Sequence, residues 1–547
     1  MRGKLSVMIL MALMTLGLTT SQAVHAAPIS CEEPVASAAG LVKGAADAES
    51  ATCSWKGVPY AAPPEGELRW KAPQPVPSWE GARETVHYGN RCWQKGMMNS
   101  LEGKSGPGMS EDCLYLNVWR PREAGVYPVM VWIHGGGYTG GTGATPMYIG
   151  DRLSENGGLV VVTINYRLNA FGFLAHEQFR EEDPHQAVGG YGSLDQVAAL
   201  QWVHDNIAHF GGDPDRVTIF GESAGGWSVC TMLATPLARG LFQGAILESG
   251  GCEASHTLEE GFGRGRKAAK KLGCAEDDVA CMRSRPAEEV LEKMMPEGLL
   301  AFPFMPHEDS YLLTGTPLRM IQAGNFNNVA FIAGSNRDEV SKVAALLKPR
   351  TYHDRARTYE KGIRKFAPDA DPARLMALYP LSQYGKPRYA YAQMFTDRAL
   401  GCPTYEGMEA VAARQPQTYY YRFDYDRFRF GQTIGAIHAM ELPFVFGNLD
   451  RKPINLLYNT PARVAEAQPL ARIIQGYWIN FAKTGNPNSE GLPAWPRFRL
   501  DDTKVQVLDV NVTTETPALA DRCQLWADYG QSYPALMENV LKAAEKK

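Results

Sequence analysis

The chain has 547 residues, of which 45% are hydrophobic, so it is long and apolar enough to bury a large core. Its formal net charge is only −4, and acidic and basic residues are interspersed, which argues against a nucleic acid as partner. The length allows either several domains or one large α/β domain.

The N-terminus predicts export. A positively charged start precedes an apolar run, and small residues stand at positions −3 and −1 of a cleavage site after Ala26. This pattern predicts a secretory signal peptide over residues 1–26. The apolar run of about 14 residues is shorter than the ~20 residues that a membrane-spanning helix needs. We therefore expect a mature chain of 27–547 in the periplasm or outside the cell, without a stable membrane anchor.

Apolar runs typical of buried strands alternate with helical patterns along the mature chain. The runs are 127–133, 158–166, 216–220, 244–247, 328–333, 418–423 and 505–510. Residues 193–210 carry apolar side chains at spacings of three and four, which predicts an amphipathic helix. The alternation predicts an α/β fold with a mostly parallel central sheet and helices on both faces. Ligands of such sheets bind beyond the carboxyl ends of the strands.

Two helix-rich regions interrupt this alternation, at 255–330 and 350–400. We interpret them as helical insertions over the active site rather than as separate domains, because no repeat or Gly/Ser-rich linker sets them apart. The tail 533–547 has the pattern of a short amphipathic helix. The segment 27–547 is therefore expected to be a single domain.

The segment Gly221-Glu222-Ser223-Ala224-Gly225 lies between the apolar run 216–220 and a helical pattern. A strand, a tight turn and a helix are the context of the nucleophile elbow of α/β-hydrolases. A chain with 54 glycines also produces such a pattern by chance, so partners elsewhere must support it. Ser223 is the predicted nucleophile, which attacks a carbonyl carbon.

The run 127–133 leads directly into His134-Gly135-Gly136-Gly137-Tyr138. Successive glycines let a backbone approach a substrate closely and direct N–H groups toward it. The N–H groups of Gly136, Gly137 and Ala224 are therefore predicted to form an oxyanion hole. Taken alone, the segment is also compatible with a plain glycine-rich turn.

A serine hydroxyl needs a base, and the base needs an orienting acid. Among the eleven histidines, His438 lies in a loop after the run 418–423, which suits the chain order Ser, acid, His. The acid should follow a strand between Ser223 and His438. Asp338 and Glu339 both follow the run 328–333, and both are candidates on physical grounds.

Longer motifs resemble the type-B carboxylesterase and cholinesterase family. They are Glu111–Val118, Gly192–Asp213, Phe220–Gly226 and His438–Gly447. The resemblance covers nearly the whole mature chain and implies the α/β-hydrolase fold. It selects Glu339 as the acid, with Val340 where the family usually has glycine. It also implies that Glu222 is a buried carboxylate beside the nucleophile and that Ser249 supports the triad.

The ten cysteines fit an exported protein that forms disulfides. Cys274 and Cys281 are close enough in sequence to close a short loop, and Cys31 and Cys53 could fasten the N-terminal segment. Cys230, in the helical pattern after the elbow, is expected to be a buried free thiol, and Cys252 is left without a partner. The family resemblance implies three pairs, which are Cys92–Cys113, Cys274–Cys281 and Cys402–Cys523.

The resemblance implies a secreted or periplasmic serine carboxylesterase that hydrolyses small carboxylic esters through an acyl-enzyme on Ser223. A lipase or an amidase of the same fold and a non-catalytic cholinesterase-like binding protein are the alternatives. No metal or organic cofactor is expected, because the sequence has no His/Cys cluster at ligand spacing and no phosphate-binding glycine loop. One hypothesis is that the ester is negatively charged, because Arg337 and Lys342 lie on either side of the acid. Another is an aromatic-lined pocket, because Tyr138 and Trp227 flank the oxyanion loop and the elbow. The oligomeric state and the natural ester are not indicated.

Overall fold

The computed structural model describes residues 30–95, 108–295, 303–339, 355–368, 370–458, 460–517 and 519–529. The predicted signal peptide and the predicted tail helix 533–547 lie outside these ranges. Within them, no helix combines the length and the apolar character that crossing a membrane requires.

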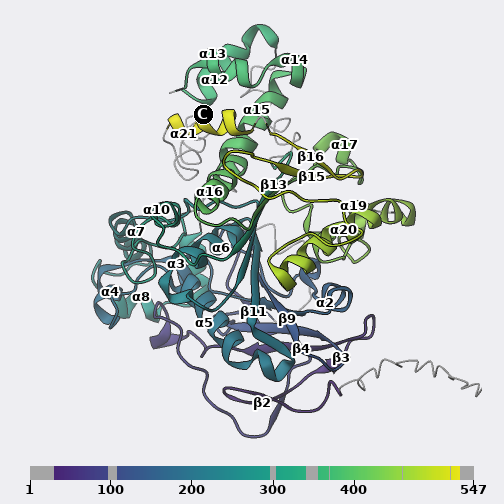
Figure 1. Ribbon diagram of the computed structural model, residues 1–547. Helices are drawn as coiled ribbons and strands as arrows, with labels where there is room; N and C mark the ends of the chain where they lie inside the picture. The colour runs from purple at the N-terminus through teal and green to yellow at the C-terminus, as the bar shows by residue number, and fades with distance from the viewer. Residues whose placement is uncertain are drawn as a thin grey trace, which may run out of the picture.

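An eleven-stranded mixed sheet forms the centre of the molecule (Figure 1). From edge to edge its strands are β16 (Thr513–Glu515), β15 (Val505–Leu508), β14 (Thr418–Phe423), β13 (Ala330–Asn336), β12 (Gly244–Glu248), β11 (Gly212–Glu222), β9 (Tyr127–Ile133), β10 (Val160–Ile164), β8 (Tyr115–Pro121), β4 (Thr52–Pro59) and β3 (Ala45–Ala46). All neighbours from β15 to β10 run parallel, and the outer pairs are antiparallel. The predicted mostly parallel sheet is confirmed, and its parallel strands are the seven predicted runs.

Helices cover both faces of this sheet (Figure 1). One face carries α3 (Asn169–Phe173), α5 (Tyr191–Asn206), α6 (Ala224–Ala234), α10 (Pro317–Ala323) and α16 (Cys402–Ala412), and the other carries α2 (Asp151–Gly157), α18 (Leu442–Val445) and α20 (Pro461–Thr484). The predicted helix 193–210 corresponds to α5 and the 3₁₀ turn after it. Strand β9 shows why both faces are apolar, since Val129 and Val131 lie in one core and Met130 and Trp132 in the other.

The remaining elements surround this centre. The two helix-rich regions contain α7 (Leu258–Lys271), α8 (Val279–Ser284), α9 (Ala287–Met294) and α10, and α12 (Tyr359–Phe366), α13 (Pro372–Leu378), α14 (Leu381–Tyr384) and α15 (Pro387–Thr396). The others are β1 (Val35–Ser37), β2 (Gly40–Lys43), β5 (Ala82–Glu84), β6 (Arg91–Cys92), β7 (Met109–Ser110), α4 (Glu177–Glu182), α17 (Gly431–Ile434), α19 (Asn455–Tyr458) and α21 (Leu519–Asp528). Figure 1 places α12 to α15 together with α21 beyond the β15–β16 end of the sheet. Residues of α14 and α15 border a cavity together with the loop that follows β13.

Five disulfides join all ten cysteines. The pairs are Cys31–Cys53, Cys92–Cys113, Cys230–Cys252, Cys274–Cys281 and Cys402–Cys523. They include the four pairs that the sequence indicated, but the expectation of a free thiol at Cys230 is wrong. Helix α6 packs beside β12, and this brings the Cα atoms of Cys230 and Cys252 within 5.1 Å, a distance that a disulfide bridges.

Loss of the Cys402–Cys523 disulfide is expected to destabilise the protein more than loss of the Cys274–Cys281 disulfide. The first joins residues 121 apart in sequence and the second residues 7 apart. Because a longer closed loop removes more entropy from the unfolded chain, we expect losses of about 5 and about 2 kcal/mol, respectively. Urea unfolding of C402A/C523A and C274A/C281A in non-reducing buffer measures both, and equal midpoints would contradict the expectation.

Candidate active site

Ser223 alone forms the turn between β11 and α6. Its φ of 59° and ψ of −123° lie in a region that residues other than glycine rarely adopt. The Ser223 N–H donates to Glu248 O at 2.9 Å, and its carbonyl accepts the first helical bond from the Trp227 N–H at 3.0 Å. The residue is only partly buried, at the start of α6. This strained strand–turn–helix has the geometry of a nucleophile elbow.

Two glycines let this turn contact the end of the neighbouring strand β9. A Cβ on Gly225 would lie 2.0 Å from Ile133 O, a clash that no side chain at that position could relieve. A Cβ on Gly135 would lie 2.6 Å from Glu222 O and 3.0 Å from the Ser223 Cβ. The loop that follows β9 therefore packs directly on the elbow.

That loop turns sharply beside Ser223. Gly136 has a φ of 110°, and its carbonyl accepts hydrogen bonds from the N–H groups of Thr139 at 3.0 Å and Gly140 at 3.1 Å. Among the described residues, no acceptor meets the N–H groups of Gly136, Gly137 or Ala224. Unpaired donors around a nucleophile can stabilise a negative charge that develops on a carbonyl oxygen.

His438 and Glu339 form a short polar contact. Glu339 follows β13 and His438 follows β14, and Glu339 Oε2 lies 2.6 Å from His438 Nδ1. The Glu339 side chain is completely buried, and its Oε1 accepts from the Asn336 N–H at 2.7 Å. Asp338 instead accepts from the Ala436 N–H at 3.1 Å and pairs with Arg337 at 2.8 Å. Of the two candidate acids, Glu339 is therefore the one that contacts the histidine.

The other ring nitrogen of His438 points toward the elbow. His438 Nε2 lies 3.1 Å from Glu222 Oε1, on the residue that precedes Ser223. No hydrogen bond links Ser223 Oγ to His438 in the described part of the chain. In enzymes without substrate such bonds are often long, and they tighten in the substrate complex. The imidazole therefore lies between two carboxylates, beside the predicted nucleophile.

For both Glu222 and His438, burial and the interaction between the two groups shift the pKa in opposite directions. Burial raises the pKa of Glu222 to about 7, although the His438 charge opposes the rise. Burial lowers the pKa of His438, but Glu222, Glu339 and the hydrogen bond to Glu339 outweigh it and raise the pKa to about 10. The pKa of Glu222 thus lies near neutral pH, and a neutral Glu222 no longer stabilises the charge on His438.

Two further buried carboxyl groups, to which the sequence analysis assigned no role, interact with Glu222. Burial raises the pKa of Glu248 to about 8, and burial together with the other carboxylates raises the pKa of Glu441. Trp478 Nε1 donates to Glu248 at 2.7 Å, and Asn336 Nδ2 donates to Glu441 at 2.6 Å. Their positions in the sequence could have indicated that they lie near the site, because Glu441 is three residues after His438 and Glu248 ends a buried strand.

The remaining predicted site residues have other surroundings. Ser249 is buried, and its Oγ has no partner among the described residues. Tyr138 and Trp227 are buried and pack against each other with ring centroids 5.8 Å apart, which is core packing. Of the two residues considered for a negatively charged ester, Arg337 forms ion pairs with Asp338 and Asp426. The other, Lys342, lies outside the described residues. No cluster of three possible metal ligands was found in the described ranges.

Comparisons with known proteins find relatives over most of the chain. A model of the carboxylesterase family matches residues 32–526. Para-nitrobenzyl esterase of Bacillus subtilis (strain 168) is 37% identical over 508 residues, which cover 90% of this chain and 98% of that protein. Acetylcholinesterase of Bungarus fasciatus is 33% identical, with 88% and 83% covered. A solved PNB esterase structure superposes with a TM-score of 0.78 at 35% identity, covering 90% of this chain and 99% of the other.

Substitution of Gly135 by alanine is expected to separate the loop from the elbow. The new Cβ would meet Glu222 O and the Ser223 Cβ, so we expect a loss of about 1–3 kcal/mol in the free energy of unfolding. Gly263, in α7, has open space around its Cβ position and serves as the matched control. Gly263→Ala should leave stability unchanged or raise it by up to about 1 kcal/mol. Equal urea midpoints for the two variants would contradict the direct contact.

Proposed function

The chain belongs to the carboxylesterase family and is a carboxylic ester hydrolase, and on this premise we propose that Ser223, His438 and Glu339 are its catalytic triad. The contact of 2.6 Å between Glu339 and His438 Nδ1 carries the proposal. A buried carboxylate at Nδ1 fixes the tautomer in which Nε2 can accept a proton, and Nε2 points toward the elbow.

The first half of the reaction forms an acyl-enzyme. His438 Nε2 takes the proton from Ser223 Oγ, which attacks the carbonyl carbon of the ester. The carbonyl oxygen becomes an oxyanion that accepts hydrogen bonds from the N–H groups of Gly136, Gly137 and Ala224. When the tetrahedral intermediate collapses, the bond to the alcohol oxygen breaks and His438 gives its proton to the departing alcohol.

The second half releases the acid. His438 takes a proton from a water molecule, which attacks the acyl carbon. The carbonyl oxygen again becomes an oxyanion and accepts hydrogen bonds from the same three N–H groups. The bond to Ser223 Oγ then breaks, and His438 returns the proton to the serine. Glu339 stays ionised throughout and stabilises the imidazolium of each step.

Glu222 has a separate part in this proposal. An ionised Glu222 at 3.1 Å competes with Ser223 for Nε2 and stabilises the charged imidazole. Because burial raises its pKa to about 7, Glu222 can be neutral near neutral pH. A neutral Glu222 leaves Nε2 available to act as the base.

For the physiological setting we propose export and a small carboxylic ester as substrate. Five disulfides support export, since such bonds form and persist in oxidising compartments, and so does the N-terminal pattern of the sequence. The para-nitrobenzyl esterase relative supports an ester rather than an amide. Matched esters, anilides and emulsified long-chain esters distinguish esterase from amidase and lipase preference.

Ser223→Ala is expected to abolish turnover of p-nitrophenyl acetate. Removal of a triad nucleophile lowers kcat by several orders of magnitude, about 10⁴–10⁶-fold. Far-UV circular dichroism of the variant should match the wild type, and a fluorophosphonate probe should no longer label it. Turnover near the wild-type value in a folded variant would rule out Ser223 as nucleophile.

Glu222→Gln is expected to move the acidic limb of the kcat/KM profile to lower pH. Loss of a carboxylate beside Nε2 lowers the pKa of His438, so more of the base is neutral at a given pH. A charge at this distance is typically worth about one pH unit or more. Glu67→Gln, at an exposed carboxylate, is the control and should not move the limb. A limb that stays in place or moves to higher pH in Glu222→Gln would contradict the assigned role.

A further inference from the structure

Gln94 is a buried glutamine, 1% exposed, two residues after Cys92. Its Nε2 donates to Gly141 O at 2.9 Å and to Cys92 O at 3.1 Å. Its Oε1 accepts from the Gly141 N–H at 2.9 Å. One side-chain amide thus satisfies both backbone groups of Gly141, as a neighbouring strand would.

Gly141 closes the loop that contains the proposed oxyanion donors. Its φ is 109°, and a Cβ there would lie 2.4 Å from His134 Nδ1 and 2.5 Å from Gly135 O. The end of the loop therefore rests on its beginning without room for a side chain. By holding Gly141, Gln94 fixes the closed form of the segment 134–141, whose N–H groups at Gly136 and Gly137 face the substrate in the proposed mechanism.

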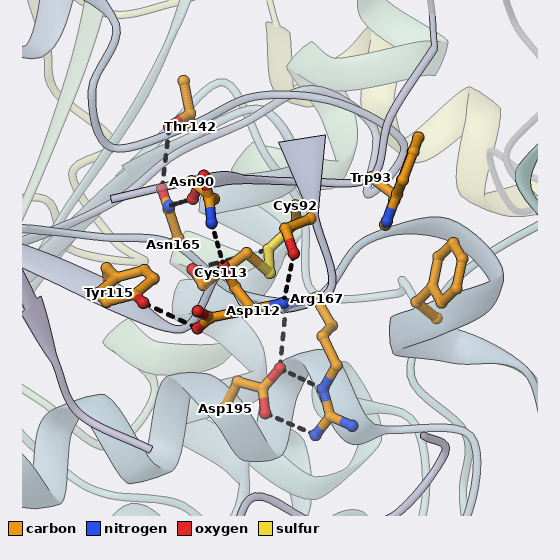
Figure 2. Close-up of a disulfide and its surroundings, with 12 residues drawn as sticks. Asn90, Cys92, Trp93, Asp112, Cys113, Tyr115, Thr142, Asn165, Arg167 and Asp195 are labelled. Atoms are coloured by element: carbon orange, nitrogen blue, oxygen red, sulfur yellow. Dashed lines mark hydrogen bonds and ion pairs between the residues drawn. A yellow bond between two sulfur atoms is a disulfide. The ribbon is translucent and has the colours of Figure 1, made fainter. Parts of the chain in front are cut away.

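Other bonds join the segment 90–94 to the same loop. Asn165 Nδ2 donates to Asn90 O at 3.0 Å, and Asn165 Oδ1 accepts from the Gly143 N–H at 2.8 Å. The Asn169 side-chain amide donates to Trp93 O at 2.6 Å, and the backbone N–H of Asn169 donates to Tyr138 O at 2.6 Å. Figure 2 shows Asn165 between Asn90 and Thr142, beside the disulfide. The segment 90–94 is thus linked to the loop at Tyr138 and Gly141, and through Asn165 to Gly143 just after it.

The Cys92–Cys113 disulfide anchors this support to the sheet. Both cysteines are at most 4% exposed, and Cys113 lies two residues before β8. Asn90 Nδ2 also donates to Asp112 O at 3.1 Å, so the two sides of the disulfide are hydrogen-bonded as well (Figure 2). The disulfide at Cys92 therefore ties the segment that carries Gln94 to the chain two residues before β8, a strand of the central sheet.

We propose that Gln94, anchored by the Cys92–Cys113 disulfide, is a positioning residue that sets the backbone of the oxyanion loop. The inference rests on the proposed function, because it assigns the loop N–H groups to the transition state. Donors of this kind act on the charge that develops during the reaction, so their displacement lowers kcat more than it raises KM. A merely structural glutamine would change stability alone.

The test compares Gln94→Met with Gln506→Met. Methionine keeps the approximate volume of glutamine and removes its hydrogen bonds. Gln506 is also 1% exposed, and it bonds to Tyr477 Oη and Thr514 Oγ1 on the β15 side of the sheet. For Gln94→Met we expect kcat to fall about 10–100-fold, KM to change less than about 3-fold, and the Ki of a trifluoromethyl ketone to rise with the fall in kcat. Gln506→Met should lose stability without these changes.

A second pair of variants covers the case in which Gln94→Met does not fold. Gln94→Glu keeps the shape and the acceptor for the Gly141 N–H but loses the donors, and C92A/C113A removes the anchor. Both should show a lowered kcat with nearly constant KM, whereas C274A/C281A, which removes a remote disulfide, should not.

The outcomes separate this role from the triad. If Ser223→Ala is inactive and Gln94→Met and Gln94→Glu retain wild-type kcat and inhibitor affinity, the positioning role is wrong and the proposed function stands. A loss of kcat no larger than that of Gln506→Met would also overturn it. If Ser223→Ala retains turnover, the proposed function fails, and the inference fails with it.

Discussion

The direct contact between the loop after β9 and the elbow after β11 is the constraint on which the site depends. Neighbouring parallel strands end at the same edge of the sheet, and glycines at positions 135 and 225 let their two turns meet without an intervening side chain. Ser223 is held in a strained conformation at this contact, and N–H groups of both turns find no acceptor among the residues that the structure describes. The same edge receives Glu339 from β13 and His438 from the loop after β14.

This arrangement gathers buried carboxyl groups around one imidazole. Burial opposes ionisation and raises the pKa values of Glu222, Glu248 and Glu441. Glu339 contacts His438 Nδ1 and accepts a hydrogen bond from the Asn336 N–H. One ionised carboxylate suffices to orient the histidine. Protonation of the others lowers the repulsion between several buried charges and removes their stabilisation of the charged His438 imidazole.

Much of this structure could be predicted from the sequence. The seven parallel strands are buried on both faces, so they read as continuous apolar runs. The outer strands do not form continuous apolar runs in the sequence. Asn117 and Arg120 interrupt β8, Lys56 and Gly57 interrupt β4, and β16 is exposed. Ser223, Glu339 and His438 follow strands in local motifs that a sequence displays. The Cys230–Cys252 bond and the contact of Gln94 with Gly141 depend on packing between distant segments, which no local pattern records.

An acyl-enzyme on Ser223 is the intermediate that the triad requires. Peptide mass spectrometry of the enzyme, acid-quenched during turnover of p-nitrophenyl acetate, tests for it directly. A Glu339→Gln variant serves as the comparison, since its histidine is less well oriented and it should acylate more slowly. We expect one acetyl group on the peptide that contains Ser223, accumulating faster in the wild type. Continued turnover with no acetyl group on that peptide, or an acetyl group on another residue, would contradict the mechanism.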